Sequence, residues 1–384
     1  MSNRPPARQL AAPFALLAGL FATYAVVLRL SAGTPWGRSA LLAALCVLAA
    51  PLLLTLVVKV LMVPKSLSRF SRLLYHALAK LIDLSQYLLP WLGWSALIAL
   101  LGGPGLSWGA ALRAGGLIAV VSYLAGLVLV LHLRPRVCDI EVTEFEFAVP
   151  GLPAAFDGYR ILHLTDLHGG GRFARASTAQ RLERASHLSP DIVVFTGDIS
   201  SRLQSVDAVA ADLSRLPGRD GRFAVLGNHD AWVGEEVATN ALTRAGFRVL
   251  ANEHIAFERG GDHLYLAGVK DASYIRADDL PAALEGIPEG APVIVLSHSP
   301  DLVIKPMADR AALILAGHTH GGQVVFPLLG PLYIPTRLGR RRMSGLIDVN
   351  GQKVFINRGL GEVFPPMRLN CPPQLALITL RPSA

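Results

Sequence analysis

The sequence predicts a chain of two parts, a region of transmembrane helices followed by an α/β domain, and three observations support this division. Hydrophobic residues make up 52% of the 384 residues, which is more than an ordinary soluble protein carries. Four long apolar windows without charged residues lie before residue 136. From Phe156 onward, polar and apolar residues mix, and short strand-like runs alternate with segments of helical periodicity.

Each apolar window has at least the ~18 to 20 residues that a helix needs to cross the hydrocarbon core of a bilayer. We therefore predict four transmembrane helices within residues 1–135. The first could instead be a signal peptide, because Arg4 and Arg8 precede it. Its apolar run is longer than that of a signal peptide and three more windows follow, which favours a retained anchor. The windows are Gln9–Leu28, Ser39–Val58, Leu84–Leu112 and Ala114–Leu133.

Lysine and arginine gather on one side of the predicted spans. They lie before the first span, between the second and third, and after the fourth, whereas the opposite side carries only Arg29, Arg38 and Arg113. Because positively charged loops stay in the cytoplasm, we expect both termini there. The sequence thus predicts a multi-pass protein of the inner, or plasma, membrane with its C-terminal domain in the cytoplasm.

The segment at about 64–83, between the second and third windows, has a helical periodicity of its own. Its basic residues recur at steps of three and four, and its apolar residues do the same on the other face. We interpret it as an amphipathic helix on an anionic leaflet, which makes membrane lipids a partner. The alternative is a cytoplasmic extension of a neighbouring span with a solvated basic face. Part of the net charge of +8 therefore comes from basic residues that orient the chain in the membrane. Nucleic acid is not an expected partner.

Residues 136–155 join the two parts and contain the alternating run CDIEVTEFEF, which is typical of a strand. We predict a connecting strand or linker here and a separate domain over residues 156–384. Cys46, Cys138 and Cys371 are odd in number and far apart in the sequence. They indicate neither a disulfide framework nor a cysteine-based zinc site.

Five apolar, strand-like runs of the domain each end in a residue that can bind a metal ion. In open α/β sheets, sites form beyond the carboxyl ends of the strands, so we expect these residues to converge in one crevice. Helical segments such as 177–188 and 234–246 would supply the crossovers. The candidate ligands are Asp166 and His168 after RILHLT, Asp198 after DIVVFT, Asn228 after RFAVL, His298 after PVIVLS, and His318 and His320 after AALILA.

This set offers two carboxylates, one amide and four imidazoles, and it contains no thiolate. Mixed nitrogen and oxygen ligands suit Mn, Fe or Zn and argue against an iron–sulfur cluster or a closed structural zinc site. One carboxylate can bridge two ions held ~3.5 to 4 Å apart, as in two-metal hydrolases that act on phosphoesters. We therefore expect two divalent metal ions, Mn in the first place, with Fe or Zn as alternatives.

The motifs DLH, GD, GNHD, SH and GHTH, in this order, resemble the complete signature of the calcineurin-like metallophosphoesterases over about 156–380. The resemblance implies a β-sandwich of two mixed sheets flanked by helices. It implies that Asp166, His168 and His320 bind one ion, that Asp198 bridges, and that Asn228, His298 and His318 complete the other site. It further implies that hydroxide held by the ions attacks phosphorus in line, that His229 protonates the leaving oxygen, and that Asp230 orients His229.

Two extended motifs, GHTHGGQ and NRGLG…MRLNCPPQ, look like the bacterial branch of membrane-associated phosphodiesterases, which includes UDP-2,3-diacylglucosamine pyrophosphatases. One position departs from the wider family. Ser200 and Ser201 follow GDI where several branches carry a further aspartate. This departure leaves open what surrounds Asp198, although it does not affect the bridging position itself.

The function expected from these features is hydrolysis of a lipid-linked or amphiphilic phosphoester, such as UDP-2,3-diacylglucosamine, by a membrane-anchored phosphodiesterase or pyrophosphatase. The apolar runs VFPLLGPLYIP (325–335) and LGEVFPPM (360–367) favour this substrate class, because they are unusually apolar for loops. One alternative is an anchored hydrolase of soluble nucleotides or nucleic acid. Another is a non-catalytic membrane interaction protein.

Several polar residues are weaker candidates. We interpret His163, His187, His254 and His263 as structural, because a single histidine is more often hydrogen-bonded than a ligand. Asp301, beside Pro300 and with Ser299 as its cap, is predicted to start a helix. Arginines in two loops could bind phosphate groups of the substrate or of lipids, or could simply be solvated: Arg172 and Arg175 after DLHGGG, and Arg337, Arg340, Arg341 and Arg342 in RLGRRR.

Overall fold

The computed structural model describes residues 98, 107–132, 140–169, 174–185, 187–273, 276–331, 333–363 and 367–383. The first two predicted spans, all of the third before residue 107 except residue 98, the basic segment at 64–83, and Arg172 lie outside these residues. The chain divides into two compact units, Met1–Leu129 and Val130–Ala384, and each is described by itself.

In the first unit the structure describes one long helix, α4 (Trp108–His132), which continues by three residues into the second unit. We predicted that the third and fourth windows would be separated at Arg113, but α4 runs through this residue without a break. Arginine is a good helix former, so a charge that divides two apolar windows does not have to end a helix. Within the described residues, no helix combines the length and the apolarity that a membrane span requires.

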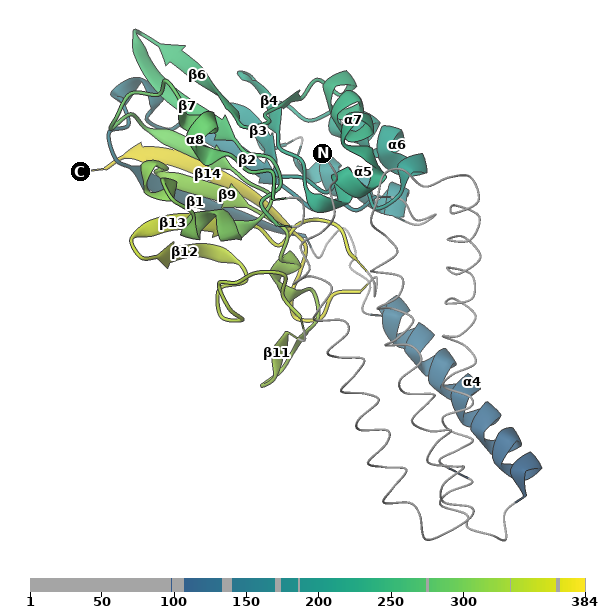
Figure 1. Ribbon diagram of the computed structural model, residues 1–384. Coiled ribbons are helices and arrows are strands. Elements are labelled where there is room, and N and C mark those ends of the chain that lie inside the picture. The colour runs from purple at the N-terminus through teal and green to yellow at the C-terminus, as the bar shows by residue number, and fades with distance from the viewer. Residues whose placement is uncertain are drawn as a thin grey trace, which may run out of the picture. The chain divides into compact units, whose positions relative to one another are not determined.

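The second unit is built from two six-stranded mixed sheets with helices around them (Figure 1), which confirms the predicted two-sheet architecture. The first sheet has the order β1 (Glu141–Val149), β14 (Gln374–Pro382), β2 (Arg160–Leu164), β3 (Ile192–Phe195), β4 (Gly221–Ala224) and β5 (Arg248–Val249). The second has the order β12 (Gly345–Val349), β13 (Gln352–Ile356), β9 (Leu313–Ala316), β8 (Val293–Leu296), β7 (Asp262–Gly268) and β6 (Glu253–Arg259).

Strands β3, β8 and β9 pair in parallel with both of their neighbours and are fully apolar, because both of their faces are covered. Every residue of β3, β8 and β9 is buried. One apolar core lies between the two sheets, a second lies under the helices of the first sheet, and a third covers the outer face of the second sheet.

The helices are α5 (Ala174–Ala185), α6 (Val206–Leu213), α7 (Asn228–Arg244) and α8 (Leu280–Leu284), with 3-10 turns η3 (Ala154–Phe156), η4 (Leu203–Ser205), η5 (Pro300–Ile304), η6 (Ala308–Arg310) and η7 (His320–Gly322).

Strand β1 is an edge strand of the first sheet. It pairs in parallel with β14 over its whole length, from Glu141 opposite Gln374 to Val149 opposite Pro382. The segment 136–155, which we predicted as a connecting strand or linker, thus contributes to the sandwich. The alternation in the sequence indicated a strand, but its partner lies near the end of the chain, where no local signal could identify it.

A small hairpin follows the GHTHGG motif and completes the fold. Its strands β10 (Val325–Phe326) and β11 (Gly330–Pro331) pair only with each other. Leu328, between the two strands, has a left-handed backbone (φ 67°) and is fully exposed. The apolar run that the sequence placed in a loop is therefore a projecting hairpin.

Candidate metal centre

The seven candidate ligands lie in the turns that follow β2, β3, β4, β8 and β9, as the sequence predicts. Asp166, His168, Asp198, His318 and His320 all have positive φ angles, between 42° and 69°. A non-glycine residue in this region costs about 1 kcal/mol or more and persists only where the surroundings hold it. The concentration of such residues at one place indicates a functional site.

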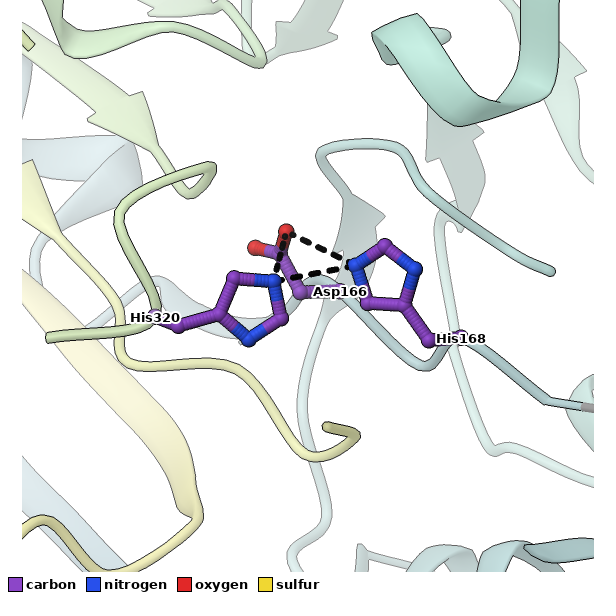
Figure 2. A group of neighbouring side chains, drawn as sticks. All are labelled: Asp166, His168 and His320. Carbon is purple, nitrogen blue, oxygen red and sulfur yellow. Dashed lines mark hydrogen bonds and ion pairs between the residues drawn. The ribbon is translucent and has the colours of Figure 1, made fainter. Parts of the chain in front are cut away.

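Asp166, His168 and His320 form the first group, and all three side chains are buried (Figure 2). The two Nε2 atoms of the histidines lie 2.9 Å apart. Asp166 Oδ1 lies 3.2 Å from Nε2 of His320 and 3.6 Å from Nε2 of His168. This oxygen is buried and accepts no hydrogen bond of good geometry from the described residues, so it is an orphaned acceptor aimed at two ring nitrogens.

These distances fit a shared cation. Donor atoms bound at about 2.1 Å to one ion lie ~3.0 Å apart in octahedral and ~3.4 Å apart in tetrahedral geometry. Burial would raise the pKa of Asp166, but the neighbouring His320 and His168 outweigh it and hold the pKa well below its ordinary value. Burial lowers the pKa of His320. A carboxylate beside a neutral imidazole is the protonation state that metal binding requires.

The second group consists of Asp198, His298 and His318, with Asn228 beside them. Nε2 of His298 lies 3.3 Å from Asp198 Oδ2, 3.0 Å from Nδ1 of His318 and 3.2 Å from Asn228 Oδ1. The same Oδ2 atom of Asp198 lies 3.4 Å from Nε2 of His168 in the first group. One carboxylate oxygen therefore faces both groups, which is the geometry of a bridging ligand.

Hydrogen bonds to neighbouring residues orient His298 and Asp166, so that Nε2 of His298 and Oδ1 of Asp166 remain available to bind an ion. Nδ1 of His298 donates to the carbonyl oxygen of Thr196 (2.7 Å), so Nε2 carries no proton in the neutral ring. Asp166 Oδ2 accepts from the Thr165 hydroxyl (2.8 Å) and from the His318 amide (2.9 Å), which leaves Oδ1 for an ion. Burial lowers the pKa of His298, but Asp198 outweighs it and raises the value to about 10. The site therefore stabilises a positive charge at the place where an ion would sit.

Comparisons with known proteins agree with this geometry. Residues 159–322 match the family model described as calcineurin-like phosphoesterase. A *Bacillus subtilis* relative named uncharacterized metallophosphoesterase YkuE is 30% identical over 276 residues, covering 71% of this chain and 94% of the relative. The chain belongs to the calcineurin-like phosphoesterases.

Two other relatives of this calcineurin-like phosphoesterase carry more specific names. Phosphodiesterase YaeI of *Escherichia coli* is 29% identical over 227 residues, which cover 58% of this chain and 82% of the relative. A transmembrane protein with metallophosphoesterase domain from *Danio rerio* is 30% identical over 262 residues, 64% of this chain and 57% of the relative. The protein is a metal-dependent phosphoesterase with a binuclear His/Asp site.

His229 lies at the edge of this phosphoesterase site, but its surroundings differ from our prediction. The hydrogen bonds found for the Asp230 carboxylate among the described residues go to backbone amides and not to the ring of His229. Its two carboxylate oxygens accept the backbone amides of Asp198 (2.7 Å), Ile199 (2.8 Å) and Gly227 (2.9 Å). Asp230 thus ties the GD and GNHD turns together, and the prediction that it orients His229 is corrected.

A different residue reaches the His229 ring. The hydroxyl of Ser201 lies 3.1 Å from Nδ1 of His229 and 2.9 Å from Nδ1 of His168. Burial lowers the pKa of His229 to about 4, so the ring is neutral near pH 7. The sequence singled out Ser201 only as a departure from the family, and the direction of its side chain could not be read from the motif.

Arg368 explains the motif MRLNCPPQ, which the sequence linked to no chemistry. Its buried guanidinium donates to the carbonyl oxygens of Gly361 (2.6 Å), Arg358 (2.8 Å) and Gly359 (3.1 Å). The same group lies 3.4 Å from the carbonyl oxygen of His320. Arg368 therefore holds the segment 358–361 and the turn of a metal-ligand candidate in one piece.

Arg337 and Arg340 are not placed as phosphate ligands of the centre. Nη2 of Arg340 donates to the carbonyl oxygens of Leu329 (2.7 Å) and Pro331, so this side chain holds the β10–β11 hairpin. Arg337 is exposed, and its backbone amide donates to the carboxylate of Asp301. Neither arginine lines the cavity described below.

The histidines that we interpreted as structural do not belong to the groups of candidate ligands among the described residues. His163 is buried, with Nε2 2.9 Å from the Thr196 hydroxyl, and His254 bonds the carbonyl oxygen of Ala283 (3.0 Å). His187 and His263 are exposed. Ser299 caps η5 as predicted, with its hydroxyl accepting from the amide of Asp301 (3.3 Å).

A cavity of about 500 Å³ opens beside the two groups. Its lining includes the polar side chains of Asp198, Asn228, His229, His318 and His320. The remaining wall is largely apolar, with Trp232, Val324, Phe326, Tyr333, Pro335, Val363 and Met367. Both apolar runs that the sequence singled out contribute to this wall.

Proposed function

We propose that this calcineurin-like phosphoesterase is a membrane-anchored phosphodiesterase or pyrophosphatase of the bacterial inner membrane. Its substrate is a lipid-linked or amphiphilic phosphoester at the cytoplasmic surface, such as UDP-2,3-diacylglucosamine. The observation that carries the proposal is the lining of the cavity, which combines metal-ligand candidates with a largely apolar wall. A phosphoester with an apolar substituent matches both parts.

The polar side chains at the metal centre have two expected roles, metal binding and proton donation. When bound, two divalent ions, with Mn as the expected species, polarise the phosphoryl group and activate water. Asp166, His168 and His320 would hold one ion, Asn228, His298 and His318 the other, and Asp198 both. His229 lines the cavity and would donate a proton to the leaving oxygen.

The hairpin extends the apolar wall outward and supports a lipid surface as the source of the substrate. Phe326 and Tyr333 line the cavity, while Leu328 is fully exposed and Leu329 is 71% exposed. The sequence from 310 to 347 carries arginines and no acidic residue. An exposed apolar tip next to a run of arginines is typical of a segment that contacts anionic lipid.

The names of the relatives support the same reading. YaeI is named a phosphodiesterase, and the *Danio rerio* relative is named a transmembrane protein. Together with the apolar windows before residue 136, these names favour a phosphodiesterase whose domain is tethered to the membrane.

A second candidate is the hydrolysis of a soluble nucleotide, and one observation favours it. The indole of Trp232 is 58% exposed, lines the cavity and lies 4.3 Å from the ring of His229, measured between centroids. An exposed indole beside the site could stack on a nucleobase. An amphiphilic nucleotide such as UDP-2,3-diacylglucosamine would use this indole and the apolar wall together.

The test is a substrate panel with the full chain purified in detergent and supplied with Mn. The panel contains UDP-2,3-diacylglucosamine, phospholipids, cyclic nucleotides and a generic aryl phosphodiester, and mass spectrometry identifies the products. Asp198→Ala and His320→Ala should each lower the activity about a hundredfold or more, whereas the exposed His263→Ala should leave it unchanged. Hydrolysis of soluble nucleotides alone would reject the amphiphilic substrate, and full activity of both metal-site variants would reject the assignment of the site.

A further inference from the structure

Ser201 occupies a position between two histidines with different tasks. Its hydroxyl oxygen lies 2.9 Å from Nδ1 of His168 and 3.1 Å from Nδ1 of His229. The rings of the two histidines lie edge to face, with centroids 4.5 Å apart. We propose that Ser201 is a positioning residue that links His168 to His229 and fixes the tautomer of His229.

The direction of the link follows from His168. Nε2 of this ring faces Asp166, Asp198 and His320, so Nε2 is the atom that would bind an ion. A neutral imidazole that binds through Nε2 carries its proton on Nδ1. Nδ1 of His168 is therefore the donor and the hydroxyl oxygen of Ser201 the acceptor.

The second hydrogen bond then has only one possible direction. A serine hydroxyl has a single proton, and with its oxygen accepting from His168 it can donate that proton to Nδ1 of His229. Nδ1 of His229 is thus an acceptor, and the proton of this neutral ring resides on Nε2. His229 lines the cavity, so the nitrogen that carries the proton is the one available to a leaving oxygen.

Neighbouring polar side chains do not provide this link in the part of the chain that the structure describes. Ser200 uses its hydroxyl on the carbonyl oxygen of Gly169 and on Ser205. The carboxylate of Asp230 is occupied by backbone amides. An aspartate at position 201 would act only as a hydrogen-bond acceptor. In a neutral His229 ring it would favour the opposite tautomer, in which Nδ1 carries the proton and Nε2 carries none. Serine at this position therefore decides which nitrogen donates.

The kinetic test compares two variants of nearly equal shape, Ser201→Thr, which keeps a hydroxyl, and Ser201→Val, which lacks one. Their kcat and KM are measured on aryl phosphodiesters whose leaving phenols increase in pKa. Ser201→Val should lower kcat about 10- to 100-fold for the poorest leaving groups and little for the best, with KM unchanged, because protonation matters most for a poor leaving group. Ser201→Thr should restore the wild-type dependence.

A second readout does not depend on activity. Histidine ¹⁵N shifts of the full chain loaded with diamagnetic Zn, assigned with His229→Gln, report which nitrogen of His229 carries the proton. The wild type and Ser201→Thr should show the proton on Nε2, whereas Ser201→Val should show a mixture of tautomers. Ser205→Ala is the matched control, because Ser205 belongs to the same hydroxyl cluster and contacts neither ring.

The outcomes separate this inference from the proposed function. It rests on the phosphoesterase chemistry alone and does not require an amphiphilic substrate. The same leaving-group dependence in Ser201→Val and the wild type, or an unchanged tautomer, would overturn it. Loss of bound metal in Ser201→Val, with the activity for all leaving groups falling equally, would assign Ser201 to the metal site only and would overturn it as well.

Discussion

At the scale of single residues, position within a strand separates structural histidines from functional ones. His163 lies inside β2, where it bonds Thr196, while His168 lies in the turn after the same strand and faces Asp166. The sequence predicts this difference, because the turn after a parallel strand opens into the crevice and the strand itself lies in the core. The partners of His229 were not predictable, because they depend on the direction of side chains from a neighbouring turn.

The burial of His163 makes the stability of the domain depend on pH. Burial lowers its pKa to about 3, whereas the unfolded chain has the ordinary value of 6.5. Below pH 6.5 the unfolded state binds the proton and the folded state does not, so the stability present above pH 6.5 is lost as the pH falls. This residue should account for about 2 kcal/mol between pH 6.5 and pH 5.

The test is the variant His163→Gln, which cannot titrate. It should be less stable than the wild type at pH 7, and the difference in unfolding free energy should shrink by about 2 kcal/mol on lowering the pH to 5. Pulse proteolysis of both proteins in urea at each pH measures this difference. A gap that stays constant with pH would show that His163 titrates normally in the fold.

At the scale of elements, the site depends on a loop far from the ligand motifs. The segment 357–361 packs against the turn after β2, where a Cβ at Gly361 would collide with the carbonyl oxygen of Leu167. Arg368 joins this segment to the turn of His320. The motif MRLNCPPQ was recognisable in the sequence, but the role of Arg368 was not. Its guanidinium donates to backbone carbonyl oxygens, which residues of any type could supply.

Removal of the Arg368 guanidinium should loosen the first metal group. In Arg368→Met the carbonyl oxygens of Gly359 and Gly361 lose their buried donor, and the turn of His320 loses its support. We expect the affinity for Mn to fall about 10- to 100-fold, because groups behind the ligands set their orientation. Metal titration followed by elemental analysis measures this. Arg381→Met, which breaks only the ion pairs with Glu146 and Asp157, is the matched control and should have little effect.

The β10–β11 hairpin should raise kcat/KM only for substrates that are embedded in a lipid surface. Leu328→Asp and Leu329→Asp place a charge on the exposed tip, which would be repelled by anionic lipid. We expect kcat/KM to fall roughly tenfold for a substrate in anionic vesicles and to stay unchanged for a soluble aryl phosphodiester. Leu346→Asp, in β12 and 47% exposed, is the control. Equal losses on both substrates would show that the hairpin matters for the site rather than for lipid contact.

At the scale of the whole molecule, the distribution of charge predicts the orientation of the chain. The basic residues near the apolar windows favour an orientation with the C-terminal domain in the cytoplasm. A reporter that is active only in the periplasm, fused after Ala384, should therefore remain inactive, while a cytoplasmic reporter at the same position should be active. A fusion after Arg38 should behave in the opposite way, and exchange of the two patterns would overturn the predicted topology.

The sequence by itself determined the α/β class of the C-terminal domain, the five strand ends and the identity of the candidate ligands, because each is a local pattern of apolar runs followed by polar turns. It also indicated β1 as a strand. Only the tertiary structure decided that β1 pairs with β14, that Asp198 Oδ2 faces both groups, that Asp230 binds backbone amides, and that Ser201 reaches His229. The reason is physical. A strand's periodicity records its own burial, whereas pairing, bridging and hydrogen bonding depend on distances between turns that are far apart in the chain.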